Sequence, residues 1–193
     1  MAAGKRQLMD AALRLMAQQE ATHALSLREL AREAGLNHNT FYRHFDSLDA
    51  LQQALVDEFT ATLAAGMQAA RERQTGPSSV THRVVGWLFD HAAAHRELFL
   101  VAYRVMHGPP CAARTALEAC LVSLQRDMLR AQRAMGLLPE GNDARWLQVL
   151  TVYGQVVFGL TVRVLEHPRQ RRRLLDEAQT LLATLVAGTQ ALR

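Results

Sequence analysis

Apolar side chains recur along this chain with the period of an α-helix. Met9, Leu13 and Met16 are spaced i, i+4 and i+7 over residues 4–19, and similar spacing recurs in the later segments. No stretch alternates apolar and polar residues between turn signals, so no strand is expected. The pattern therefore predicts an all-α protein.

Two short helices are expected after the first one. Ser26 and Glu29 have the spacing of a capping box, which predicts a helix start. Gly35 suits the left-handed residue that ends such a helix. Asn37 can cap a third helix, and Ser47 a long fourth one over residues 47–72.

The turn-forming segment QTGPSS follows the fourth helix and is the best candidate for a boundary between subdomains. Beyond it the apolar spacing predicts five more helices. Their breaks fall at HGPP, at LLPEGN and at the His-Pro pair 167–168. The expected ranges are 80–94, 96–106, 111–135, 143–166 and 170–191.

The composition of the 193 residues fits a folded domain, because 49% are hydrophobic and 21% are charged. These values exclude a disordered, collagen-like or low-complexity chain. Lysine and arginine total 22 against 18 acids, which gives a net charge of +4. Lys5 is the only lysine, so nearly every cation is an arginine, a side chain suited to phosphate and carboxylate partners.

The two cysteines, Cys111 and Cys120, would lie on opposite faces of one helix, so an internal disulfide is not expected. The amino terminus lacks an apolar leader, and we expect a cytoplasmic protein. Residues 146–162 carry no charge, but this run falls just short of the roughly 18 residues of a membrane span. Gln148 and Gln155 interrupt it, which favours a helix buried in protein and no membrane.

The segment N-H-N-T-F-Y-R-H-F, residues 37–45, follows the glycine turn. A helix-turn-helix needs a short bracing helix, a turn and a second helix with exposed polar side chains. Phe41 and Phe45 lie one turn apart and should face inward. The polar side chains then left for base edges and phosphates are His38, Asn39, Thr40, Tyr42, Arg43 and His44.

An ordinary helical corner with a solvated polar face is the alternative interpretation of this segment. Residues 1–49 hold six basic and six acidic side chains, so net charge gives no support to DNA binding. Any DNA contact must come from where the charges are placed.

The segment LSLRELAREAGLNHNTFYRHFDSLDAL, residues 25–51, resembles the DNA-binding domain of TetR-family transcriptional regulators. Within that family it is most similar to the branch that represses unsaturated fatty-acid synthesis genes, which shares ALVDE, here residues 54–58. The resemblance implies a helix-turn-helix domain over residues 1–50. The long helix would join it to a helical ligand-binding and dimerisation domain over residues 73–193.

The resemblance also implies roles for single residues. Thr40, Tyr42 and His44 match positions that meet bases or backbone. Many members carry a basic tail before the first helix, whereas this chain offers only Lys5 and Arg6 there. We therefore expect Arg28 and Arg43 to supply more of the phosphate contact, with double-stranded operator DNA as the partner.

A family member of this kind would be a homodimer on a palindromic operator, would not be an enzyme and would need no cofactor. A small-molecule effector would shift the population between two arrangements of the dimer. The branch points to a long-chain acyl-CoA, and an efflux or degradation repressor with another apolar effector is the alternative. The aromatic side chains expected around the acyl chain are Trp87, Phe99, Tyr103 and Phe158.

The head group of an acyl-CoA needs arginines, and the densest group is Arg169, Arg171, Arg172 and Arg173. The last two expected helices are the candidates for the subunit contact. Gly154 and Gly159 would allow close approach in the first of them. The second has an apolar stripe, formed by Leu174, Ala178, Leu181 and Leu185.

Two other classes of protein compete with this interpretation. His91 and His95 are spaced i, i+4 beside Asp90, which would let a small helical enzyme hold a metal ion. The segment lacks the glutamate of zinc hydrolases, so we expect structural histidines and no metal. The third class is a helical interaction or chromosome-coating protein that reads no sequence.

Overall fold

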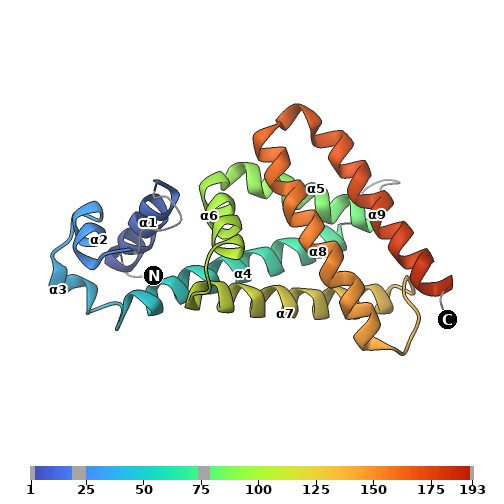
Figure 1. Ribbon diagram of the computed structural model, residues 1–193, viewed down its shortest axis with the longest axis horizontal. Helices are drawn as coiled ribbons and strands as arrows, with labels where there is room; N and C mark the ends of the chain where they lie inside the picture. The colour runs from blue at the N-terminus through green and yellow to red at the C-terminus, as the bar shows by residue number, and fades with distance from the viewer. Residues whose placement is uncertain (1–2, 19–24, 74–78, 192–193) are drawn as a thin grey trace. The chain divides into compact units, whose positions relative to one another are not determined.

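The structure, a computed structural model, describes residues 3–18, 25–73 and 79–191. These residues form α-helices and one 3₁₀ turn, with no strand among them, which confirms the all-α prediction (Figure 1). The helices are α1 (Ala3–Gln18), α2 (Leu27–Glu33), α3 (His38–Phe41), α4 (Leu48–Glu72), α5 (Val80–Ala94), α6 (Arg96–His107), α7 (Ala112–Ala134), α8 (Asp143–Glu166) and α9 (Arg171–Ala191). The expected end of the first helix at residue 19 and most of QTGPSS lie outside the described residues.

Contacts divide the chain into two compact units. The first consists of Met1–Ala61 and His95–Glu118, and the second of Thr62–Ala94 and Ala119–Arg193. Helix α4 begins in the first unit and ends in the second, and so does α7. The helix α6 groups with the amino-terminal helices, whereas the sequence pattern assigned it to the region 73–193.

In the first unit α1 packs against α2, α3 and α6. The α6 contact includes a hydrogen bond that the Arg104 guanidinium donates to the carbonyl of Ala17, 2.9 Å away. Phe59 of α4 and Phe99 of α6 meet edge to face, with ring centroids 5.2 Å apart. The core of the helix-turn-helix region is apolar throughout and includes Leu8, Met9, Ala12, Leu30, Phe41, Phe45, Leu51 and Leu55.

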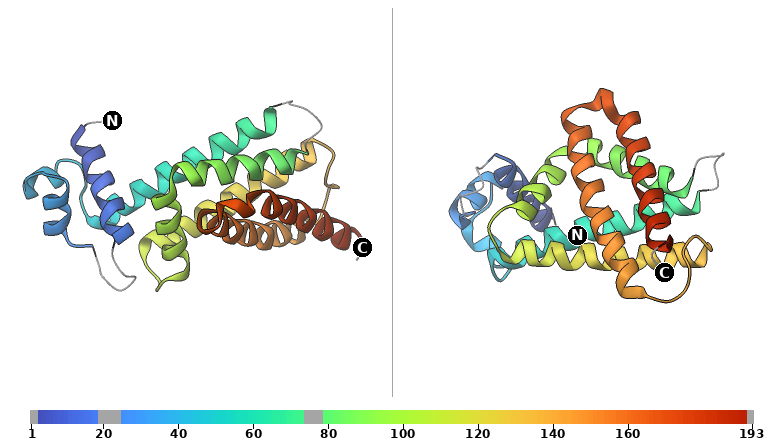
Figure 2. Two further views of the ribbon diagram at one scale, coloured as in Figure 1. Left: turned by 90° about the horizontal axis from the view of Figure 1, so that it is seen from above. Right: turned by 45° about the vertical axis from the view of Figure 1, so that its right-hand side comes forward.

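In the second unit α8 packs against α5 and α9, and α9 also packs against α5. A 3₁₀ turn over Pro168–Gln170 lets α9 fold back beside α8 (Figure 2). Leu174 and Ala178 of α9 are completely buried in the core of this unit. These two members of the predicted subunit-contact stripe are therefore already covered by their own chain, which corrects that part of the prediction.

The helix α8 is long and apolar enough to cross a membrane by length and composition alone. The core helices of globular proteins can share both properties. Trp146, Leu150 and Leu160 of α8 are buried in the core cluster that α5 and α9 complete. Its apolar character therefore serves the packing of the second unit.

Both cysteines are free thiols, as expected. Cys111 is exposed just before α7, and Cys120 is buried within it. The sequence pattern placed both cysteines on one helix, whereas in the structure only Cys120 lies within α7 and Cys111 comes just before it. The structure therefore gives the two sulfur atoms no common site.

Candidate DNA-binding surface

The start and the end of α2 are fixed by local hydrogen bonds. The Ser26 hydroxyl oxygen accepts from the Glu29 amide at 3.2 Å and donates to the Glu29 carboxylate at 2.7 Å. At the other end Gly35 has φ of +64°, and the amides of Gly35 and Leu36 donate to the carbonyls of Arg32 and Ala31. This pair of bonds is a Schellman motif, which needs a left-handed residue and so favours glycine. The predicted turn is confirmed.

The next helix, α3, is shorter than the sequence pattern suggested. Its Asn37 cap accepts from the Asn39 amide at 2.9 Å, as expected. Regular helix ends at Phe41, and residues 42–44 continue as hydrogen-bonded turns, in which the amides of Phe45 and His44 both donate to the Phe41 carbonyl. The chain therefore keeps helix-like curvature over residues 38–45 without regular helix to the end.

Two aromatic rings anchor this segment to the core. Phe41 is 1% exposed and Phe45 is 5% exposed, and their ring centroids are 5.8 Å apart. The prediction that both rings face inward is confirmed. Since they occupy one side of the segment, the neighbouring side chains must point elsewhere.

Most of the predicted DNA-binding side chains are solvent-exposed. Tyr42 is 57% exposed, an unusual environment for so large a ring. Its ring lies 5.5 Å from that of His38, which is also exposed. The remaining members differ in burial: Arg28, Asn39 and Arg43 are exposed, while Thr40 and His44 are partly buried. Most of the predicted DNA-binding side chains are therefore accessible to a partner in this structure.

The partial burial of His44 comes from α1. A Cβ atom placed on Gly4 would lie 2.7 Å from Nε2 of His44, so the imidazole rests against the α1 backbone. The Lys5 ammonium lies 5.3 Å from the centre of the Phe45 ring. Sequence reasoning missed both contacts, although a glycine within the first turn of a helix was a signal that close approach is required.

Two arginines of α1, Arg6 and Arg14, form ion pairs with nearby acids. Arg6 pairs with Asp10 and Glu58, and these hydrogen bonds raise the pKa of the Arg6 guanidinium above its ordinary value. Arg14 pairs with Glu33 at 2.8 Å. Within the described residues, Arg28 and Arg43 form no ion pair. Each pair uses one cation and one acid, so the zero balance over residues 1–49 is unchanged, but Arg28 and Arg43 keep charges that could meet phosphate.

The four aromatic residues predicted around a ligand serve different packing roles. The Trp87 ring lies on the α4 backbone, since a Cβ atom on Gly66 would come within 1.8 Å of it. Phe99 is completely buried against Phe59. Tyr103 packs its ring at 4.1 Å from that of His107. Phe158, the fourth, is partly buried in α8.

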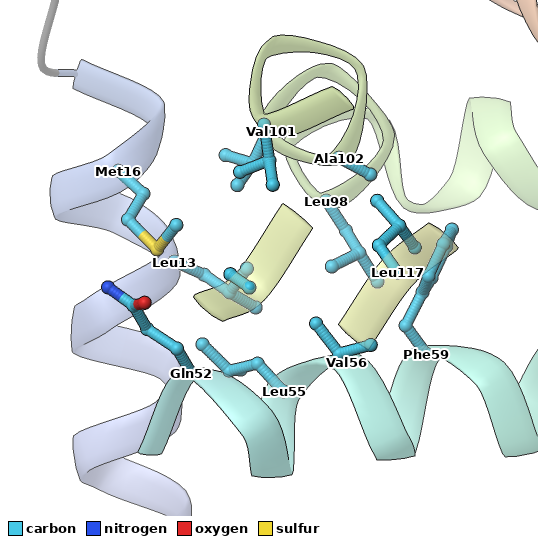
Figure 3. A pocket seen from close by; sticks show the side chains of 12 residues that line it. Leu13, Met16, Gln52, Leu55, Val56, Phe59, Leu98, Val101, Ala102 and Leu117 are labelled. Carbon is cyan, nitrogen blue, oxygen red and sulfur yellow. The ribbon is translucent and has the colours of Figure 1, made fainter. Parts of the chain in front are cut away.

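A small apolar cavity lies inside the first unit (Figure 3). Its volume is about 40 Å³, and every lining side chain except Gln52 is apolar. Leu13 and Met16 of α1 face Val101 of α6 across it (Figure 3). This volume is far below the roughly 300–1,000 Å³ of ligand pockets. The cavity is therefore a packing gap between α1, α4, α6 and α7, and none of the four predicted ligand residues lines it.

The two histidines whose spacing would allow a metal pair, His91 and His95, do not lie on one helix. His91 belongs to α5 and stacks on Trp87 with ring centroids 4.8 Å apart. The helix ends at Ala94, so His95 lies beyond it. Asp90 accepts two hydrogen bonds from Arg171, at 2.9 and 2.8 Å. Among the described residues no group of three or more His, Cys, Asp or Glu side chains could hold a metal ion.

The arginine group before α9 is also partly engaged. Arg171 joins α9 to α5 through Asp90 and through the carbonyl of Gly86, 3.1 Å away. Arg173 donates to the side chain of Gln170 at 2.6 Å. Arg169 and Arg172 are exposed. Arg171 therefore binds residues of α5 in this structure, whereas we expected it to contact a phosphate of the ligand.

Comparison with known proteins adds a family. Residues 8–55 match the family described as bacterial regulatory proteins, tetR family. A relative from Haemophilus influenzae, named an uncharacterized HTH-type transcriptional regulator, is 37% identical over 112 residues, which make up 58% of this chain and 55% of the relative. The matched region thus spans about half the length of that curated relative.

Solved structures share the fold over nearly the whole chain. The fatty acid degradation regulator FadR from Bacillus halodurans has a TM-score of 0.73 and 16% identity over 97% of each chain. FadR from Bacillus subtilis, solved in complex with stearoyl-CoA, has a TM-score of 0.64 and 18% identity over 95% of this chain and 98% of that one. At these identities the likeness is one of fold.

Proposed function

We propose that the chain is a TetR-family regulator, a ligand-responsive repressor that binds operator DNA as a homodimer, and the match of residues 8–55 to that family supports this. One observation carries the proposal. His38, Asn39, Tyr42 and Arg43 of the α3 segment are exposed, while Phe41 and Phe45 hold the segment to the core. A surface that is both polar and rigidly backed suits base recognition, because each contact then needs little ordering of the protein.

The predicted DNA-binding side chains divide by the contact that each would make. Asn39 and Thr40 carry the short polar groups that hydrogen bond to base edges. Tyr42 would donate its phenol to a phosphate, and Arg28 and Arg43 would add charge-assisted bonds. Asp10 of α1 and Glu33 of α2 are paired with Arg6 and Arg14, so these two acids would repel DNA less than unpaired carboxylates would.

Substitutions at these positions test the proposal. Tyr42→Phe should weaken binding by about 1 kcal/mol on every operator variant, because it removes one backbone-type hydrogen bond. Asn39→Ala or Thr40→Ala should change the preferred base at defined positions, at about 1–3 kcal/mol each. Fluorescence anisotropy at fixed salt measures both. Arg126→Gln, an exposed change on α7, is the control. Unchanged affinity in all three variants would contradict the assignment.

The homodimer contact is proposed on the exposed face of α8. Val152 is 47% exposed and Val156 is 39% exposed, one turn apart, and a Cβ atom on Gly159 would meet nothing within 4 Å. Gly154 instead faces Gln125 of the same chain. Apolar side chains left exposed at helical spacing suit a second helix as partner. Leu181 and Leu185 pack against the core of their own unit, so we revise their predicted role.

Charge on this face should separate the subunits. Val152→Asp together with Val156→Asp would bury unpaired carboxylates at the contact, so the double variant should sediment as a monomer. A monomer should also lose tight operator binding, because only one half-site is then engaged. Leu181→Glu would disturb the core instead and would lower the melting temperature. A double variant that stays dimeric would move the contact elsewhere.

The effector is proposed to be a long-chain acyl-CoA, and the support is twofold. The segment 25–58 resembles the fatty-acid branch of the family, and one solved relative of the same fold is in complex with stearoyl-CoA. The continuous helix α4 would connect ligand binding with the position of the α3 segment, since it has residues in both units. Titrating palmitoyl- and oleoyl-CoA into the protein–operator complex tests this. If neither changes operator affinity at micromolar concentration, the acyl-CoA is excluded and an effector of another apolar class is favoured.

A further inference from the structure

A second and much larger cavity lies within the second unit, between the last turns of α4 and of α7. It is open to solvent and has a volume of about 490 Å³, which lies within the roughly 300–1,000 Å³ of small-molecule sites. The two helices run side by side along this stretch (Figures 1 and 2). Its apolar lining side chains are Ala64, Met67, Leu124, Ala131, Ala134 and Met135.

Four charged side chains also line this α4–α7 cleft, and three of them have partners. Glu72 accepts from the Gln68 amide at 2.9 Å. Asp127 pairs with Arg130 one turn further along α7. Arg71 makes no ion pair with any residue that the structure describes, although Asp127 is near enough to interact with its charge.

The position of Arg71 makes its lack of a close partner significant. Its side chain is half-buried, and burial lowers the pKa of the guanidinium while the charges of Asp127 and Glu72 offset part of that effect. A half-buried guanidinium keeps several hydrogen-bond donors that the protein does not use. Carboxylate and phosphate groups match those donors in pairs.

We propose that the α4–α7 cleft binds an anionic amphiphile whose carboxylate or phosphate meets Arg71 and whose apolar part lies along Met67, Leu124 and Met135. The two methionines suit an apolar chain of variable shape, because their side chains are flexible and polarizable. The charge on Arg71 selects an anion over a neutral molecule of the same size. That the bound molecule acts as the effector rests on the proposed function, whereas its binding does not.

Three probes of equal chain length test the site: dodecanoate, dodecyl phosphate and dodecanol, each below its micellar concentration. We expect dodecanoate or dodecyl phosphate to bind at least about tenfold more tightly than dodecanol. Comparison of the two anions then tells a carboxylate ligand from a phosphate ligand. Isothermal titration with the full chain, without DNA, gives the affinities. Equal binding of anion and alcohol, or no binding at all, would overturn the proposal.

Matched variants locate the binding. Arg71→Gln should reduce the anions to the affinity of dodecanol, and Arg126→Gln, exposed on α7 outside the cleft, should leave all three affinities unchanged. Ala131→Trp should fill the cleft and abolish binding of every probe. Ala64→Leu fills it from α4 if the tryptophan variant does not fold. Retained selectivity in Arg71→Gln, or undiminished binding in a folded filled variant, would show that the anion binds elsewhere.

The outcome can be separated from that of the proposed function. Operator binding is measured on the same preparations without any amphiphile. Operator binding without probe binding would overturn the cleft assignment alone. Probe binding that follows Arg71, in a protein that selects no DNA sequence, would support the cleft and contradict the repressor proposal.

Discussion

The helix-turn-helix region and the second unit use the same kinds of side chain in different ways. Between residues 25 and 51 the turns and helix ends are set within a few residues, by Ser26, Gly35, Asn37 and the Phe41–Phe45 pair. In the second unit apolar side chains on α8 and α9 also follow helical spacing, yet some fill the core and others face solvent. Periodicity alone cannot tell these roles apart.

A core deletion in each unit makes the strongest test of this contrast. Phe41→Ala and Phe89→Ala each remove a fully buried ring, which should cost about 3–5 kcal/mol of unfolding free energy. Because the rings lie in separate core clusters, hydrogen exchange should lose protection chiefly in the unit that carries the substitution. Equal loss of protection in both units after either substitution would contradict the division.

A glycine pair tests the packing that sequence reasoning missed. Gly66→Ala should destabilise the protein by about 1–3 kcal/mol, because its Cβ atom would overlap the Trp87 ring. Gly188→Ala, on α9 with nothing within 4 Å of the new atom, should stabilise it by about 0.5–1 kcal/mol. Thermal unfolding measures both. A neutral Gly66→Ala would show that Trp87 is free to move and available to a ligand.

The pH dependence of stability tests the burial of Tyr153 in the core of the second unit. Burial raises the pKa of the Tyr153 hydroxyl, which has no hydrogen-bond partner among the described residues. The unfolded chain loses this proton near pH 10 while the folded chain keeps it, so stability is full below pH 10 and falls above it by about 1.4 kcal/mol per pH unit. Tyr153→Phe should remove this slope and change neutral-pH stability little. Identical slopes in parent and variant would place the hydroxyl in contact with water.

The ion pair between Arg171 of α9 and Asp90 of α5 is expected to have the smallest effect on stability. Arg171 and Asp90 are joined by two hydrogen bonds, but both side chains are more than one-third exposed. A double-mutant cycle with Arg171→Gln and Asp90→Asn should therefore give a coupling of about 0.2–1 kcal/mol, reduced by salt. A coupling of zero would return Arg171 to the group of free cations available for phosphate.

Sequence reasoning predicted the helices well, because caps, glycine turns and apolar spacing act over one or two turns. The ranges 80–94 and 143–166 agree with α5 and α8 to the residue. It could not predict contacts between residues far apart in the chain, such as Trp87 on Gly66 or Arg171 on Asp90. The grouping of α6 with α1 was missed for the same reason, since nothing local to either helix encodes its partner.

Sequence reasoning could predict which side chains of the α3 segment are candidates for DNA binding, because the burial of the two phenylalanines determines which of their neighbours stay exposed. Phe41 and Phe45 are buried, and their neighbours are consequently exposed. Sequence reasoning could not predict the α4–α7 cleft, because its lining residues come from two helices that are far apart in the sequence. A cleft of this kind depends on the distance between two helices, which no spacing within one helix determines.

Selection from a random pool of double-stranded DNA tests the central claim, that the exposed side of the α3 segment recognises DNA sequence. The parent protein should enrich an inverted repeat whose half-sites lie about one helical turn apart, or a multiple of it. The Asn39→Ala, Thr40→Ala double variant should keep the half-site spacing but lose base preference within each half-site. No enriched sequence, or the same half-site sequence enriched by parent and variant, would contradict the account.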